Sequence, residues 1–274
     1  MKVAINGGAF ALHTQIDGVE GAPWLILSNG LGTDLTVWEP QVAQWAARFR
    51  ILRYDTRGHG LSEGPPGPYA PDDLVRDVVG LMDHYGIARA TLMGLSLGGA
   101  TCVGVALHEP KRVSALICCD ARVDSPPPYV QAWAERIALV EKAGTTAIVN
   151  GSMERWVTAP TRAARPDLVQ RLRAMLENTS DQGYMACAAA LQHLAYFDRL
   201  HAITCPTLFV VGSLDTASPP EVMAAMAAQV AGAQLVQVPE AAHISNLENV
   251  AAFNATVDEF MVSLQSDESQ VVSA

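Results

Sequence analysis

A serine lies between two glycines in a segment whose spacing suits nucleophilic catalysis. Residues 94–98 read GLSLG, which matches the pattern G-x-S-x-G. The segment directly follows an apolar run at residues 90–94 and opens a helical stretch. Small residues on both sides permit the tight strand-to-helix turn that exposes a serine hydroxyl. The pattern therefore predicts Ser96 as a nucleophile.

A serine hydroxyl needs a base, and the base needs a carboxylate that orients it. Asp215 follows an apolar run at residues 207–212, and His243 follows another at residues 234–238. The order serine, acid, histidine is one in which such triads occur along a chain. Without a catalytic role, His243 would be a solvated loop histidine and Asp215 a turn residue or helix cap.

Acyl transfer also requires donors for the oxyanion that forms at the carbonyl. The backbone N–H of Leu97 is one candidate, because it lies at the helix start just after the nucleophile. The second donor is expected from the loop SNGLG at residues 28–32, with the N–H of Leu31 as the candidate. The glycines of this loop let its backbone approach a substrate closely.

The composition excludes several other kinds of function. Half of the 274 residues are apolar and 17% are charged, which excludes a disordered chain. The net charge of −10 disfavours nucleic acid and anionic membranes as partners. An uncharged stretch at residues 90–107 is as long as a membrane helix, but its glycines and hydroxyl residues favour a buried strand that turns into a buried helix.

Cysteine usage and the first residues predict a cytoplasmic protein. The five cysteines are an odd number without paired metal spacing, which indicates free thiols in a reducing compartment. Residues 6–8, NGG, interrupt any apolar run that a signal peptide would need. Neither a metal nor a cofactor is expected.

Apolar runs with strand character alternate with amphipathic helical stretches, which predicts a mostly parallel sheet covered on both faces. Two further strands, around residues 2–6 and 10–16, are expected to form a hairpin at the sheet edge. The parallel strands are expected at residues 24–28, 50–55, 90–94, 113–119, 207–212 and 234–238.

This alternation lapses between residues 123 and 200. The span opens with three prolines and then contains helical patterns. An insertion between two strands of one sheet is expected over their carboxyl ends, where open α/β sheets bind ligands. The helical pieces are expected around residues 129–143, 145–156, 166–178 and 181–196. The predicted organisation is a core of residues 1–122 and 201–264, a helical cap of residues 123–200 and a polar tail of residues 265–274.

Over nearly its whole length the sequence resembles the α/β-hydrolase superfamily. The resemblance rests on the segment around Ser96, on Asp215 and His243, and on DTRGHGLS at residues 55–62. Asn29 stands where many superfamily members have a histidine, which resembles the pattern of 3-oxoadipate enol-lactonases. Further segments shared with those lactonases are QIDG near Gln15, LSNGLGTD from Leu27, YDTRGHGLS from Tyr54, Arg155-Trp156 in the cap and HISN from His243.

The resemblance implies an α/β-hydrolase sheet with a helical cap and a cofactor-free serine hydrolase of aromatic catabolism in the β-ketoadipate pathway. Its substrate would be a small enol-lactone that carries a carboxylate, 3-oxoadipate enol-lactone. A carboxylesterase or another lactonase on the same triad is the alternative among enzymes. A ligand-sensing protein without turnover is the alternative from another class. The segment DTRGHGLS is expected to brace a loop rather than to catalyse.

An acidic protein that binds an anionic lactone needs a cation in its pocket, because a bare carboxylate is costly to bury. Six arginines lie in or beside the cap: Arg122, Arg136, Arg155, Arg162, Arg165 and Arg199. Arg122 is the first candidate because it follows a strand end, and Arg155 is the second. The alternative for Arg122 is a local ion pair with Asp120 or Asp124. Trp133 and Trp156 either line the pocket or form the core of the cap. The expected partner is thus a small anionic lactone, and a homo-oligomer is left open.

Overall fold

Eight strands form one sheet in the computed structural model, which describes the backbone of residues 1–271 and the side chains of residues 1–5 and 7–264. The spatial order of the strands is β1-β2-β4-β3-β5-β6-β7-β8. Their bounds are β1 Lys2–Ile5, β2 Phe10–Gly18, β3 Trp24–Ser28, β4 Arg50–Tyr54, β5 Ala90–Leu95, β6 Val113–Cys119, β7 Thr207–Gly212 and β8 Gln234–Val238.

The sheet is parallel apart from one edge. β1 pairs with β2, and β2 pairs with β4, in antiparallel register, whereas β4, β3, β5, β6, β7 and β8 pair in parallel. The hairpin and the six parallel strands expected from the sequence are therefore confirmed. The interior strands β5 and β7, each paired on both sides, are buried at every residue, which explains why they are continuous apolar runs rather than alternating ones.

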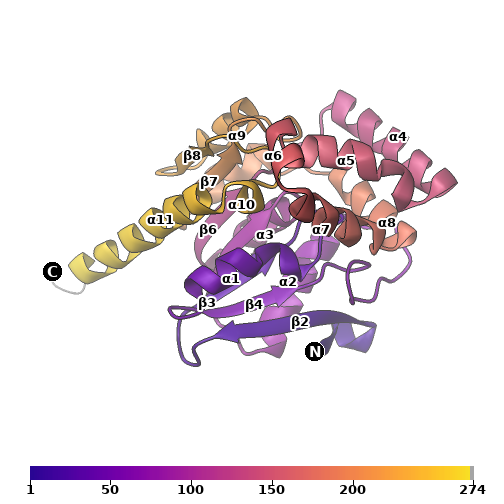
Figure 1. Ribbon diagram of the computed structural model, residues 1–274. Helices are drawn as coiled ribbons and strands as arrows, with labels where there is room; N and C mark the ends of the chain where they lie inside the picture. The colour runs from indigo at the N-terminus through magenta and orange to yellow at the C-terminus, as the bar shows by residue number, and fades with distance from the viewer. Residues whose placement is uncertain (272–274) are drawn as a thin grey trace.

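Helices that alternate with the strands along the chain pack around the sheet. α1 (Glu39–Trp45) packs against α10 (Ser245–Glu248) and α11 (Val250–Val271), and α2 (Pro71–His84) packs against α3 (Leu97–His108). Figure 1 shows α1 and α11 in front of the sheet. A short helix, α9 (Pro220–Ala227), packs against β7 and β8.

Five α-helices lie between β6 and β7 in the chain and gather at one side of the molecule (Figure 1). We refer to them as the cap helices; α4 packs against α8, and α5 against α7. Four match the expected helical pieces, while α6 falls in a stretch without a predicted element. α8 ends five residues before the expected end, because the chain there turns into a bridge between Asp124 and Ala195. Their bounds are α4 Pro127–Ala143, α5 Val149–Trp156, α6 Ala159–Ala164, α7 Pro166–Glu177 and α8 Asp181–Leu191.

Several expectations from composition can be compared with the described residues. The uncharged stretch at residues 90–107 is indeed a buried strand followed by a buried helix. Among the described residues no helix has the length and apolarity to cross a bilayer. All five cysteines are free, and Cys205 is the one that is not fully buried. The backbone of residues 265–271, which were expected to belong to a polar tail, continues α11, and residues 272–274 lie outside the described residues.

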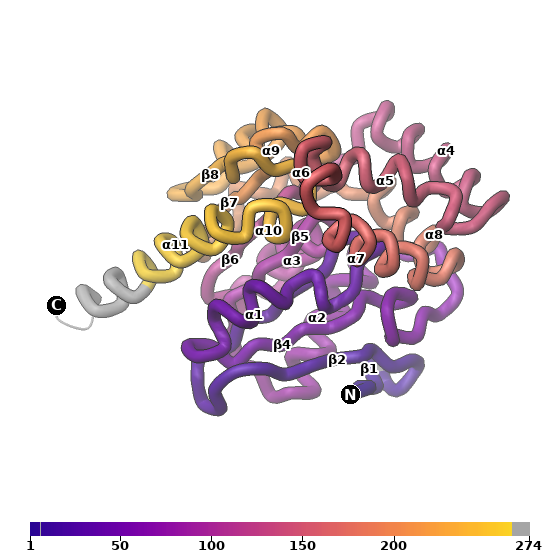
Figure 2. Tube along the Cα trace, in the orientation of Figure 1, coloured from indigo at the N-terminus to yellow at the C-terminus, as the bar shows by residue number. Residues whose placement is uncertain are grey.

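The trace in Figure 2 follows the chain from β1 at one sheet edge, through the central strands, to the cap helices and back into β7 and β8. Parallel strands all point the same way, so the loops after β3, β5, β6, β7 and β8 leave the sheet at one edge. This carboxyl edge is where the sequence had placed the chemistry-bearing residues.

Candidate active site

Ser96 is the single residue between the end of β5 and the start of α3. Its backbone has φ 54 and ψ −116, a sparsely populated conformation for a residue with a side chain. The glycines on either side are required because a larger residue would collide with the backbone. A Cβ atom at Gly94 would lie 2.1 Å from the carbonyl oxygen of Gly98, and a Cβ atom at Gly98 would lie 2.2 Å from the carbonyl oxygen of Ser28. The local sequence thus forces the turn that presents the hydroxyl.

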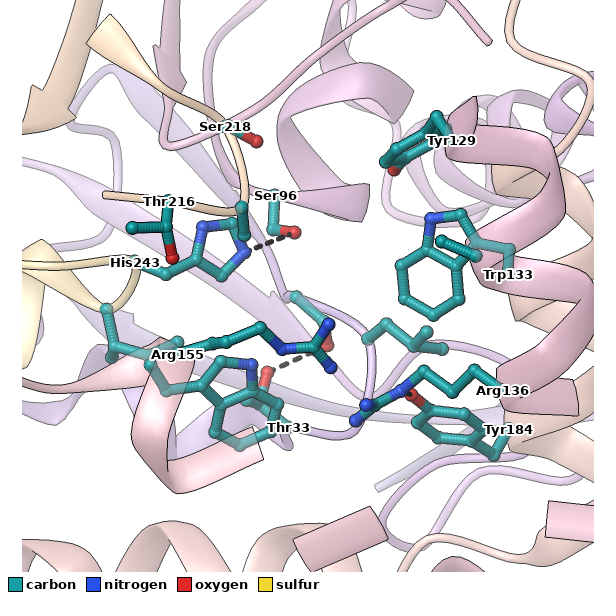
Figure 3. A pocket seen from close by; sticks show the side chains of 16 residues that line it. Thr33, Ser96, Tyr129, Trp133, Arg136, Arg155, Tyr184, Thr216, Ser218 and His243 are labelled. Carbon is teal, nitrogen blue, oxygen red and sulfur yellow. Dashed lines mark hydrogen bonds between the residues drawn. The ribbon is translucent and has the colours of Figure 1, made fainter. Parts of the chain in front are cut away.

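The structure brings Ser96, His243 and Asp215 together. The His243 Nε2 atom lies 2.9 Å from Ser96 Oγ, and its Nδ1 atom lies 2.8 Å from Asp215 Oδ2. Figure 3 shows the imidazole turned toward the serine hydroxyl. Asp215 is itself held in place, because its Oδ1 atom accepts hydrogen bonds from the backbone N–H groups of Ala217 at 2.7 Å and Ser218 at 3.1 Å.

The surroundings of His243 favour a base that can hold a proton. Burial, the largest single effect, acts to lower the pKa of His243. The charge of Asp215, the hydrogen bond to it and the charge of Asp120 together raise the pKa by more, so that its net value lies above the ordinary one. The nearby charge of Arg155 opposes this rise. Such an arrangement can take a proton from the serine hydroxyl and stabilise the imidazolium that results.

The two backbone N–H groups predicted to hold an oxyanion, those of Leu31 and Leu97, belong to segments beside Ser96. Leu97 is the first residue of α3, so its N–H has no acceptor within the helix. Leu31 lies in the loop after β3 and lines the same cavity as the serine. That loop is pinned, because both the N–H and the Oγ1 of Thr33 donate to the carbonyl oxygen of Gly30, at 3.2 and 2.8 Å.

A cavity of about 230 Å³ lies between the carboxyl edge of the sheet and the cap helices. Ser96 and His243 face it from the sheet side. Aromatic and cationic side chains face it from the cap (Figure 3). The lining residues from the cap helices are Tyr129, Ala132, Trp133, Arg136, Arg155, Trp156 and Tyr184. Trp133, Arg155 and Trp156 thus reach the cavity as the sequence had suggested, although Trp156 is also buried among core residues.

Two guanidinium groups enter this cavity from opposite sides (Figure 3). Arg136 donates to the hydroxyl groups of Tyr184, at 2.5 Å, and of Ser152, which are both uncharged partners. The guanidinium of Arg155 forms no hydrogen bond or ion pair within the described part of the chain. Desolvation, followed by the charge of Arg136, lowers the pKa of Arg155. The cavity therefore carries positive charge that no described carboxylate neutralises.

Arg122 is not among the residues that line the cavity, so the first choice for a substrate cation was wrong. Its Nε and NH2 groups donate to Asp124 Oδ1 at 3.0 and 2.8 Å, which is the local ion pair weighed as the alternative. The guanidinium also lies over the ring of Tyr129, 4.4 Å from its centroid. The carboxylate of Asp124 thus binds the guanidinium of Arg122, which packs against Tyr129, a residue that lines the cavity.

Arg136 was among the six arginines considered, but sequence reasoning did not favour it. Its position carried a usable signal: Tyr129, Trp133 and Arg136 are spaced four and three residues apart, which places them on one face of α4. No comparable pattern pointed to Tyr184, because it reaches the cavity only through the packing of α8 against α4.

The segment DTRGHGLS is a brace, as expected. Asp55 accepts hydrogen bonds from the N–H groups of Leu35 and Leu61 at 2.7 and 2.9 Å, and Arg57 forms a buried ion pair with Asp77. None of these residues lines the cavity. Within the described residues, no cluster of three or more His, Cys, Asp or Glu side chains could hold a metal ion.

Comparisons with known proteins show the family to which the fold belongs. A family model described as the alpha/beta hydrolase fold matches residues 23–250. The chain is 36% identical to 3-oxoadipate enol-lactonase 2 of Acinetobacter baylyi, covering 95% of this chain and 96% of that protein. It matches the crystal structure of the enol-lactonase from Burkholderia xenovorans LB400 with a TM-score of 0.92 and 38% identity, covering 96% of this chain and 100% of that one. A thermophilic esterase from Thermogutta terrifontis matches with a TM-score of 0.89 and 28% identity, covering 96% of this chain and 98% of that one.

Proposed function

The chain belongs to the α/β-hydrolase family, and from that premise we propose that it is a serine hydrolase that opens a small enol-lactone bearing a carboxylate, with 3-oxoadipate enol-lactone as its substrate. The observation that carries the proposal is the line of hydrogen bonds from Ser96 through His243 to Asp215 at the base of a cavity that also holds two unneutralised arginines. The enol-lactonase relatives support the choice of substrate.

In the proposed acylation, the Ser96 Oγ atom attacks the lactone carbonyl carbon while His243 Nε2 takes the hydroxyl proton. The N–H groups of Leu31 and Leu97 donate hydrogen bonds to the oxyanion. When the tetrahedral intermediate collapses, the bond between the carbonyl carbon and the ring oxygen breaks. His243 returns its proton to that oxygen, which leaves as an enol and tautomerises to a ketone. An ester to Ser96 remains.

In the proposed deacylation, a water molecule attacks this ester and gives its proton to the same His243 nitrogen. The bond to Ser96 Oγ then breaks, and the serine recovers its proton from the histidine. The product carries one more carboxylate than the lactone. Asp215 stabilises the imidazolium in both halves of the reaction and keeps the proton on Nδ1.

We assign recognition of the substrate carboxylate to Arg136 and Arg155. The protein has a net charge of −10, so an anionic ligand needs local positive charge to enter. A planar guanidinium can bind a carboxylate through two parallel hydrogen bonds. Both arginines come from the cap helices, which supports the division of residues 123–200 as a cap that supplies the substrate side of the pocket.

The test is a substrate panel on the purified protein with Ser96→Ala as its partner variant. The enol-lactone should have the highest kcat/KM among the enol-lactone, simple lactones and p-nitrophenyl esters. Ser96→Ala should lower kcat by roughly 10³-fold or more, since only binding and oxyanion contacts remain. Turnover by that variant close to the unaltered protein would refute the covalent role of Ser96.

A carboxylesterase is the second candidate, and one observation favours it. The Thermogutta terrifontis esterase shares 28% identity and the whole architecture with this chain. The same panel separates the two functions, because an esterase would prefer neutral p-nitrophenyl esters over the anionic lactone. Turnover faster than about one per second on any of these substrates would dispose of a purely ligand-sensing role.

A further inference from the structure

A buried carboxyl group at the end of β6 has no part in the proposed reaction. Asp120 is fully buried and has φ 46, which is left-handed backbone. Within the described residues it forms no ion pair with a lysine or arginine. Burying a carboxyl without a cation and holding a non-glycine residue in left-handed backbone both cost free energy. The contacts of this side chain must offset those costs.

Those contacts join the two segments that carry the acid and the base. Asp120 Oδ1 accepts a hydrogen bond from the N–H of Gly212 at 2.7 Å, and Gly212 ends β7 three residues before Asp215. Asp120 Oδ2 accepts a hydrogen bond from Ser245 Oγ at 2.5 Å, and Ser245 opens α10 two residues after His243. One side chain therefore bridges the segments on either side of the hydrogen bond between His243 and Asp215.

The backbone beside Asp120 reaches the third segment. The carbonyl oxygen of Cys119 accepts a hydrogen bond from the N–H of Ser96 at 2.8 Å, and the N–H of Asp120 donates to the carbonyl oxygen of Val210 at 2.8 Å. The end of β6 thus contacts the segments of nucleophile, acid and base. Asp120 does not line the cavity, so a bound substrate does not touch it.

We propose that Asp120 is a positioning residue for His243, holding the loop of the histidine against the end of β7 so that the imidazole reaches Ser96 and Asp215 at once. This inference rests on the proposed function, in which His243 is the base. The distances of 2.8 and 2.9 Å on the two sides of the imidazole leave little room for displacement. Loss of the bridge should therefore reduce the rate of the chemical step and leave substrate binding intact.

The charge state of Asp120 determines which variants are informative. Burial, followed by the neighbouring charge of Asp215, raises the pKa of Asp120, while His243, Ser245 and the Gly212 N–H oppose the rise. A raised pKa favours the uncharged form of this group. Asparagine matches it in shape and charge, and its amide keeps both contacts because a serine hydroxyl can accept as well as donate.

The experiment compares Asp120→Ala, Asp120→Asn and Ser245→Ala at pH 7 with the enol-lactone and with p-nitrophenyl acetate. Asp120→Ala should lower kcat by about 10- to 100-fold with KM changed by less than about twofold. Asp120→Asn should recover most of that loss. Ser245→Ala removes the hydrogen bond to Asp120 Oδ2 and leaves the carboxyl in place. Its kcat should lie between those of Asp120→Ala and Asp120→Asn.

The matched control is Asp258→Ala. Asp258 also accepts hydrogen bonds from another element, from Trp45 and Gln44 of α1, but it lies away from the cavity. Its loss should lower the melting temperature and leave kcat per folded molecule unchanged. Circular dichroism and thermal melting give the folded fraction for every variant. If Asp120→Ala does not fold, Ser245→Ala measures the same bridge.

Three outcomes would overturn the proposal. The first is a kcat of folded Asp120→Ala equal to that of the unaltered protein. If Asp120→Ala does not fold, the same result for Ser245→Ala counts instead. The second is a loss that is fully accounted for by the unfolded fraction, as in the control. The third is an asparagine variant as slow as the alanine variant, which would assign the effect to charge. Ser96→Ala in the same assays distinguishes the two proposals. If Ser96→Ala keeps its activity, the proposed function is refuted. If Ser96→Ala is inactive while Asp120→Ala is fully active, only the positioning role of Asp120 is refuted.

Discussion

At the scale of single residues, the chemistry depends on how charge is arranged around two side chains. His243 gains its basicity from Asp215 against the opposing effect of burial, and Arg155 keeps its charge in a cavity where no described carboxylate neutralises it. Both effects are electrostatic and local. They can therefore be changed by isosteric or nearly isosteric substitutions.

Asp215→Asn should shift the pH dependence of kcat/KM. The base must be uncharged to act, so activity rises as pH increases through the pKa of His243. The carboxylate of Asp215 raises that pKa. Without it, burial and the charge of Arg155 lower the pKa against the smaller opposing effect of Asp120. The acidic limb should move to lower pH, while the plateau of kcat falls by about 100-fold or more because the tautomer is no longer held. A pH profile of the variant that keeps the wild-type acidic limb would contradict this assignment.

Arg155→Gln should discriminate between anionic and neutral substrates. Loss of a charged hydrogen bond to the carboxylate should lower kcat/KM for the enol-lactone by ~10- to 150-fold, equivalent to ~1.5 to 3 kcal/mol. A neutral p-nitrophenyl ester should be almost unaffected. Steady-state kinetics on both substrates measure the difference.

Two further arginines serve as controls for this prediction. Arg173→Gln also removes one positive charge from the cap helices, at α7, where Arg173 pairs with Glu177 outside the cavity. It should leave kcat/KM unchanged for both substrates. Arg122→Ala breaks the brace with Asp124 and should reduce activity on both substrates alike. Equal losses on both substrates for Arg155→Gln would mark that residue as structural.

At the scale of elements, the turn between β5 and α3 determines whether the nucleophile is presented at all. Ser96 occupies its strained backbone because the strand and the helix on either side are packed into the core and leave a single residue to connect them. The turn fits only because the residues two positions before and after the serine, Gly94 and Gly98, have no side chains.

Gly94→Ala should be severely destabilising. The new Cβ would meet backbone atoms of Gly98 and Gly99 at 2.1 to 2.6 Å, and backbone within a buried turn cannot move aside. We expect a loss of about 3 kcal/mol or more in unfolding free energy, or failure to fold. Chemical denaturation measures it.

Gly151→Ala is the matched control, since Gly151 lies within α5 and has no atom within 4 Å of the added Cβ. Alanine there should raise stability by about 0.4 to 1 kcal/mol. If both alanine variants had the same stability, close packing would not be the reason for glycine at position 94.

At the scale of the whole molecule, one continuous core spans the sheet, its covering helices and the cap helices. The cap supplies the aromatic and cationic side of the cavity, and the sheet supplies the nucleophile and base. The reactivity of the thiols measures how easily this core opens, because the cysteines lie in β6, α3, α8 and the segment just before β7.

A thiol reagent such as DTNB should react with at most one cysteine in the native protein and with five after unfolding in guanidinium chloride. Burial raises the pKa of Cys102, Cys118, Cys119 and Cys187, which keeps them protonated and inaccessible. Cys205 is partly exposed and should react first, and Cys205→Ser should abolish the native reaction. Rapid native reaction of two or more thiols would show that the core opens easily.

The sequence by itself determined the positions of Ser96, Asp215 and His243 because each follows an apolar strand, and parallel strands end at a common edge. The strand ends, the glycines of the turn and the insertion after β6 are all properties of short, contiguous stretches. They could be predicted without knowing which residues meet across the fold.

Only the tertiary structure decided which cations reach the cavity and which groups support the histidine. Arg122 is occupied by Asp124, while Arg136 enters the cavity because α4 packs on α8. Asp120 meets Ser245 across 125 positions of the chain. Such contacts depend on how separate elements pack and how side chains share the available partners, and no local pattern of apolar and polar residues records that.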